Sequence, residues 1–148
     1  MLDRMYKEYP EGDAPAGMER VAESLRRADG FVFVSGEYNW GMQPGLKNLT
    51  DHFLEEWFWR PAAVVSYSAG RLAGARASYV WHPTLAMGMV VVPGAVSVPQ
   101  IGSALDEDGN PRGEAGQFVH GEIDKTIDTL AWWGQAARDM RAVAPRPS

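Results

Sequence analysis

The order of apolar and polar residues predicts alternating helices and strands. Apolar side chains recur every three or four positions over residues 18–28, which is typical of an amphipathic helix that ends near Asp29-Gly30. Residues 31–34 are apolar without alternation, so we expect a strand that is covered on both faces. Residues 1–15 are polar and contain two prolines and a glycine, which predicts a loop.

The same alternation continues through the middle of the chain. Pro44 suits the first turn of a helix, and the apolar stripe that follows extends this predicted helix to Trp57. Arg60-Pro61 should end it, and residues 62–65 read as a second buried strand. The members of the stripe are Leu46, Leu49, Phe53 and Trp57.

The last part of the chain is less regular. A helix over residues 73–85, kinked or frayed by Pro83, precedes an apolar strand at residues 89–92. Residues 95–113 lack periodicity and suggest a flap or loop with a turn at Asp108-Gly109. A final helix is expected from about residue 114 to 140, followed by a disordered tail at residues 141–148. Its predicted buried stripe is Val119, Ile123, Ile127, Leu130 and Ala137.

Helices that alternate with buried strands indicate an α/β fold with a parallel sheet and helices on both faces. The 148 residues fit a single domain, residues 1–148. In such sheets ligands bind beyond the carboxyl ends of the strands. The loops that follow the first two strands are therefore the places to look for function.

Composition excludes several classes of function. The net charge of −5 argues against nucleic acid or an anionic membrane as a partner. The absence of cysteine excludes disulfides, thiol catalysis and thiolate metal sites, and the three histidines lack metal-binding spacing. No apolar run reaches the roughly 20 residues of a membrane span, and residues 1–6 lack the apolar centre of a signal peptide. We therefore expect a cytoplasmic protein without a metal.

The first of the two loops, residues 36–41, combines aromatic rings, an amide and two glycines. A flat heteroaromatic ligand needs a surface to lie on and backbone donors for its polar rim. The same residues would also serve as an ordinary turn between strand and helix. The candidate binding residues here are Gly36, Glu37, Tyr38 and Asn39.

The second loop, residues 66–76, is rich in small residues that allow a ligand to approach the backbone. Arg71 or Arg76 could contact a phosphate or neutralise an anionic ring. Close packing with two solvated arginines explains the pattern equally well. The candidate binding residues here are Ser68, Ala69, Gly70 and Arg71. Ser66 to Gly70 also resembles a degenerate nucleophile elbow of a hydrolase, with Asp106 and His120 following in order.

Taken together, the motifs of residues 28–92 resemble those of the NADPH-dependent FMN reductase family, a flavodoxin-like group with quinone, chromate and azo-dye reductases. The resemblance rests on the two loops and the segments beside them. The residues that carry it are Asp29-Gly30 before the first strand, Glu37-Tyr38-Asn39, Pro44-Gly45-Leu46-Lys47-Asn48 with Asp51, and residues 68–76.

The resemblance implies an oxidoreductase in which NADPH passes hydride to bound FMN, and a small acceptor such as a quinone takes the electrons. Glu37, Tyr38 and Asn39 would form the loop under the flavin ring, with Ser68 and its neighbours on the other side. No catalytic acid, base or nucleophile is implied. A homodimer or homotetramer is implied as well, and two aromatic clusters, residues 57–59 and 132–133, are candidate interfaces with internal burial as the alternative.

The family also begins with a strand, a Ser/Arg-rich phosphate-binding loop, a helix and a second strand, and nothing similar precedes Met1. We therefore expect the N-terminal βαβ part to be missing, which would leave residues 31–34 at a sheet edge. Two alternatives to the enzyme follow. One is a truncated, non-enzymatic flavin-binding or interaction module, and the other is a flavodoxin-like electron carrier.

Overall fold

Two parallel strands, β1 (Phe31–Gly36) and β2 (Pro61–Tyr67), form the centre of the computed structural model, which describes residues 4–144. They pair over the whole of β1, from Phe31 beside Ala62 to Gly36 beside Tyr67. Two short strands, β3 (Val90–Val91) and β4 (Val96–Val98), pair with the opposite side of β2, also in parallel. The expected parallel sheet is confirmed.

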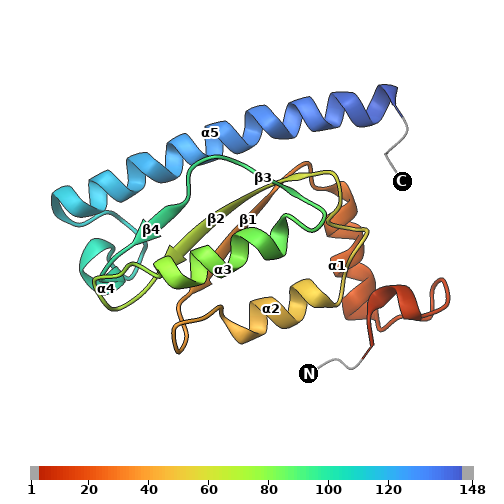
Figure 1. Cartoon of the computed structure of the whole chain (residues 1–148), viewed down its shortest axis with the longest axis horizontal. Coiled ribbons are helices and arrows are strands. Elements are labelled where there is room, and N and C mark those ends of the chain that lie inside the picture. Colours follow the sequence, from red (N-terminus) through yellow and green to blue (C-terminus); the bar gives the residue numbers. More distant parts are fainter. Residues whose placement is uncertain (1–3, 145–148) are drawn as a thin grey trace.

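Helices cover both faces of this sheet (Figure 1). The long C-terminal helix α5 (Gly113–Val143) lies on one face. The other face carries α1 (Ala16–Arg27), α2 (Pro44–Asp51) and α3 (Ala75–Leu85). A short 3-10 helix (Tyr6–Glu8) and α4 (Ile101–Ala104) complete the elements. Within residues 4–144, no helix is both long enough and apolar enough to cross a bilayer.

The larger core lies between the sheet and the three helices α1, α2 and α3. Its centre is aromatic: the Trp57 ring meets Phe31 edge-on with 4.8 Å between ring centroids, and Trp81 lies 5.4 Å from Phe33. A smaller core lies under α5, where Val119 and Leu130 are buried with the outer face of β2 and β4. These two cores fix the sheet between its helical layers.

The strand β1 differs from the expectation that both of its faces are covered. Val32 and Val34 have 38% and 54% of their surface exposed, because α5 packs over β2 and β4 rather than over β1. Among residues 4–144, β1 pairs only with β2, so it lies at the edge of this sheet, as expected for residues 31–34. An apolar strand at a sheet edge is open to pairing with another chain.

The helix α2 ends at Asp51, six residues before the predicted end at Trp57. The Thr50 hydroxyl donates back to Leu46 O at 2.8 Å, and the Trp57 indole donates at 3.2 Å to Thr50 O, a carbonyl that a longer helix would use. Trp57 is thereby folded back into the core. The proposal that Trp57 belongs to an intersubunit surface is therefore wrong.

Residues 89–113 contain more structure than the expected strand and flap. β3 is only two residues long, while β4 and α4 occupy part of the predicted loop. β4 escapes detection because three residues are too few to reveal a periodicity. The turn at Asp108-Gly109 is confirmed, since Gly109 has a φ of 85° and its N–H donates to Asp106 O at 3.1 Å.

The final helix continues to Val143, so the prediction of a disordered tail is wrong for residues 141–143. Residues 145–148 of that tail lie outside the described residues. The buried stripe also runs differently, because Ile127 is exposed and Thr126 takes its place against the sheet. The stripe consists of Gly116, Val119, Thr126, Leu130 and Gly134.

Candidate functional site

The β1–β2 pairing brings the two predicted loops together at the carboxyl ends of the strands. Glu37 N–H donates to Tyr67 O at 3.0 Å, so the loops leave the sheet side by side. They enclose an open hollow of about 440 Å³, a volume within the usual range of small-molecule sites. The hollow is lined by Glu37, Asn39, Trp40, Ser68, Gly70, Arg71, Leu72 and Arg76.

The first loop is a tight turn. Tyr38 and Gly41 exchange backbone hydrogen bonds of 3.0 and 2.8 Å, and the two residues between them, Asn39 and Trp40, have φ values of 46° and 66°. Left-handed backbone is tolerated by asparagine but is costly for tryptophan. The turn projects Trp40 into solvent, with 73% of its surface exposed.

The second loop is held by a segment that the sequence reasoning missed. Ser68 N–H donates to Val98 O at 3.2 Å, and Ile101 N–H donates to Ser68 O at 3.1 Å. Gln100 N–H donates to Gly70 O at 3.1 Å. The end of β4 and the start of α4 therefore fix the path of this loop, and β4 is too short for a sequence periodicity to reveal it.

Gly74 allows α3 to begin directly against the end of β2. Its φ is 74°, and a Cβ atom at this position would lie 2.8 Å from both the N and the O of Tyr67. Only glycine satisfies both the backbone conformation and the close approach. Gly74 therefore determines how closely the second loop lies against the end of the sheet.

The two arginines of the second loop have different surroundings. Arg76 Nη1 lies 3.0 Å from Glu37 Oε1, its backbone N–H donates to Glu37 Oε2 at 3.1 Å, and its guanidinium lies 4.3 Å from the Trp40 ring centroid. Arg71 is exposed and makes no hydrogen bond or ion pair within residues 4–144. The sequence left open which arginine would meet an anion, and the free one is Arg71.

Several backbone donors around the hollow are also free. Eight N–H groups of the two loops have no hydrogen-bond partner among the described residues, and those of Asn39, Trp40, Ala69, Gly70 and Arg71 are among them. A flavin ring carries carbonyl and nitrogen acceptors along its edge, so a row of free donors beside small residues fits it. The phosphate of FMN requires cations or further N–H groups as partners, and the Arg71 guanidinium is one such cation.

Five of the eight predicted binding residues line the hollow: Glu37, Asn39, Ser68, Gly70 and Arg71. The other three do not. Gly36 belongs to β1, where a Cβ atom would lie 3.1 Å from the Tyr67 ring, while Tyr38 and Ala69 are exposed beside the hollow. Trp40 and Leu72 line the hollow but were not predicted as binding residues, although Trp40 belongs to the predicted loop and directly follows Asn39.

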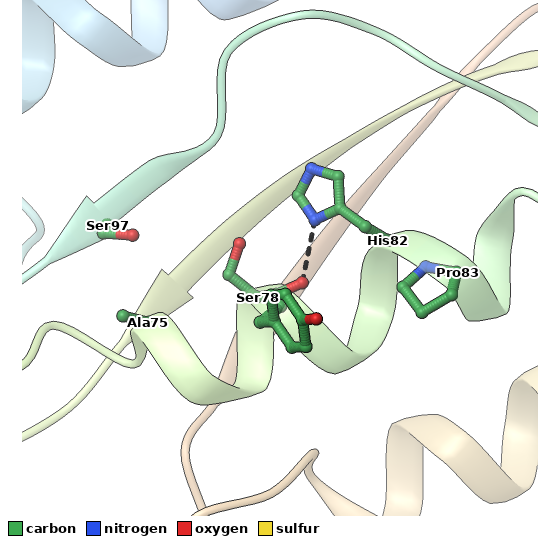
Figure 2. Close-up of a pocket in the computed structure, with 6 residues that line it drawn as sticks. Ala75, Ser78, His82, Pro83 and Ser97 are labelled. Atoms are coloured by element: carbon green, nitrogen blue, oxygen red, sulfur yellow. Dashed lines mark hydrogen bonds between the residues drawn. The ribbon is translucent and has the colours of Figure 1, made fainter.

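A second hollow, of about 580 Å³, lies between α3 and β4 (Figure 2). The Ser78 hydroxyl and the His82 ring rise from α3 on the same side, and the His82 Nδ1 atom lies 2.8 Å from Ser78 O. Ser97 faces them from β4 and lies within 3.0 Å of Ser66 Oγ. None of these residues was a predicted site residue. The described residues contain no group of three or more side chains arranged to hold a metal ion.

The chain belongs to the NADPH-dependent FMN reductase family, whose model matches residues 2–103. The matched segment includes β1, β2, both loops and α3. The expected family membership is thus confirmed, and the fold is the flavodoxin-like α/β sandwich expected from the sequence.

Individual relatives and a solved structure agree with this assignment. An NAD(P)H-dependent FMN reductase of Nectria sp. is 31% identical over 117 residues, which cover 76% of this chain and 57% of that protein. A quinone reductase of Pseudomonas putida is 29% identical over 82% of this chain and 69% of its own length. The flavoenzyme FerB of Paracoccus denitrificans, an NAD(P)H:(acceptor) oxidoreductase, superposes with a TM-score of 0.70 at 25% identity, covering 84% of this chain and 75% of FerB.

The coverage of the relatives is partial. The chain spans 57% of the Nectria protein and 40% of an NAD(P)H-dependent FMN reductase of Pseudomonas aeruginosa, which is 39% identical over 75 residues. The matched segments therefore cover about half of the length of these two relatives.

Replacing Gly74 by alanine should destabilise the protein. The left-handed backbone and the overlap with Tyr67 together should lower the free energy of unfolding by about 3 kcal/mol. Gly70→Ala is the matched control, because the nearest atom to its added Cβ is Ser68 Oγ at 3.9 Å, and it should change stability by less than about 0.5 kcal/mol. Urea unfolding followed by circular dichroism measures both, and equal losses in the two variants would contradict the role given to Gly74.

Proposed function

We propose that the protein is an FMN-dependent NAD(P)H oxidoreductase whose flavin site is the hollow between the two loops. The observation that carries the proposal is the convergence of free backbone donors, small residues and one unpaired cation on this hollow. The hollow lies within the segment that matches the NADPH-dependent FMN reductase family. The relatives named as FMN and quinone reductases support the same reaction.

The loop residues would hold the cofactor from two sides. We assign the free N–H groups of Asn39 and Trp40 to one side, and those of Ala69, Gly70 and Arg71 to the other. The Arg71 guanidinium would favour negative charge on the bound group. When FMN is bound, it supplies the capacity to take a hydride from NADPH and to pass electrons on.

No side chain of the hollow is needed as a catalytic acid or base. Glu37 is the carboxylate of the site, and both of its oxygens accept hydrogen bonds from Arg76. Both carboxylate oxygens are therefore occupied by donors of the protein itself. The role of the protein is therefore to bind, to orient and to exclude water on the loop side of the ring.

The rim of the hollow suggests the kind of electron acceptor. Trp40 and Leu72 expose 73% and 56% of their surface beside the hollow. An exposed ring and an aliphatic side chain suit a flat, partly apolar molecule, and the quinone reductases among the relatives support a small quinone. We further propose that the protein acts in the cytoplasm, where it would draw on the NADPH pool of the cell.

We also propose that the protein is a homodimer or a homotetramer. Trp132 and Trp133 lie on α5 with 67% and 39% of their surface exposed, and their rings meet edge-on at 5.1 Å. Paired tryptophans exposed to water are typical of interface centres. This is the second of the two aromatic clusters expected at an interface; in the first cluster, Trp57 is buried.

The oxidoreductase proposal predicts a yellow protein. Titration with FMN should quench flavin fluorescence to saturation, and NADPH added without oxygen should bleach the bound flavin near 450 nm. A quinone added next should restore the colour. A protein that FMN cannot saturate would contradict the proposal, whereas saturation without bleaching by NADPH would favour an electron carrier.

The subunit proposal predicts a mass of at least twice 16.3 kDa by size exclusion with light scattering. Trp132→Lys should shift the protein to the monomer, because burying a lysine in the contact is costly. His120→Lys, on an exposed part of the same helix, is the matched control and should leave the mass unchanged. A monomeric native protein would contradict the proposal.

A further inference from the structure

The link between the two loops depends on a single side chain. Beyond the β1–β2 pairing and the backbone bond from Glu37 to Tyr67, each hydrogen bond between residues 37–43 and 68–76 in the described chain involves Arg76 and the carboxylate of Glu37. The Glu37 side chain is only 10% exposed. Its two oxygens accept hydrogen bonds from the backbone N–H and the guanidinium of Arg76. This arrangement fixes the carboxylate in both position and orientation.

The Arg76 guanidinium also contacts the ring of Trp40. Trp40 lies in the tight turn with a φ of 66° and with most of its surface exposed, so little in its own loop holds the ring. The Arg76 guanidinium lies 4.3 Å from the centroid of that ring, a distance at which cation and ring attract each other. Arg76 therefore contacts the first loop at two points, one polar and one aromatic.

We propose that Arg76 is the positioning residue of the ring site. It holds the turn of residues 38–41 at a fixed distance from the second loop through Glu37 and Trp40, and it does not itself bind the ligand. The proposal deepens the proposed function and rests on it for the identity of the ligand. The two arginines differ in role because their charges are paired differently: Arg76 is neutralised by Glu37, and Arg71 remains available for an anion.

The geometry distinguishes a positioning arginine from an anion-binding one. The Nη1 atom of Arg76 is used by Glu37, and the guanidinium lies over the Trp40 ring. Lysine keeps the charge but has neither the fork nor the planar face. Arg76→Lys should therefore behave like Arg76→Ala if the residue positions the turn, and like the native protein if only its charge matters.

Amide hydrogen exchange of the ligand-free protein tests the inference directly. The N–H groups of Tyr38 and Gly41 are bonded across the turn and serve as reporters. Both Arg76→Lys and Arg76→Ala should speed their exchange about tenfold by NMR, because the turn loses its outside support. Arg27→Ala, an exposed change on α1, is the control and should leave them unchanged. Unchanged exchange in the Arg76 variants would overturn the inference.

FMN titration supplies the second readout. Arg76→Lys should weaken FMN binding about tenfold, and Trp40→Ala combined with Arg76→Ala should weaken it no more than Arg76→Ala alone, since both changes release the same turn. Losses that multiply would mean that Arg76 contacts the ligand independently and would overturn the inference. If the native protein fails to bind FMN, the proposed function fails, and the exchange measurement still decides the role of Arg76.

Discussion

The parallel pairing of β1 with β2 is the constraint on which the candidate site depends. The pairing keeps the strands in register as far as Gly36 and Tyr67, so the loops that follow them begin at the same level of the sheet. Gly74 then lets α3 start against Tyr67, and β4 holds the second loop from the other side. A slip of the register by one residue would break each of these contacts, because every side chain of the strand would change face.

The electrostatics of the loops follow from this placement. Once the loops lie side by side, Glu37 and Arg76 are within reach of each other and form a largely covered ion pair. The pair occupies both oxygens of the carboxylate, and the remaining polar groups of the hollow are mainly unpaired backbone N–H groups and Arg71. Such a surface suits binding and orienting an electron-transfer group rather than carrying out acid–base chemistry.

The sequence predicts the architecture well, and most of the candidate binding residues lie around one hollow. Each of the three predicted strand segments contains a strand. Both loops that follow the first two strands line the hollow, as expected because ligands bind at the carboxyl ends of parallel strands. Five predicted binding residues line the hollow for the same reason. Periodicity is a local property, however, and it describes only what a segment could bury.

What remained unpredicted depends on distant parts of the chain. The exposure of Val32 and Val34 follows from where α5 crosses the sheet, and α2 ends early because Trp57 folds back onto Thr50. The ion pair of Glu37 with Arg76 joins residues 39 positions apart. The sequence suggested two equivalent arginines, and only the fold assigns one to the turn and leaves the other free.

The central claim is that the two loops together form one flavin site. NMR titration of the nitrogen-15-labelled protein with FMN tests it most directly, because each backbone amide reports separately. The account predicts chemical-shift changes concentrated in residues 36–41 and 68–76, with none at Ser78 and His82 in the hollow between α3 and β4. Changes confined to that second hollow, or to one loop alone, would contradict the account.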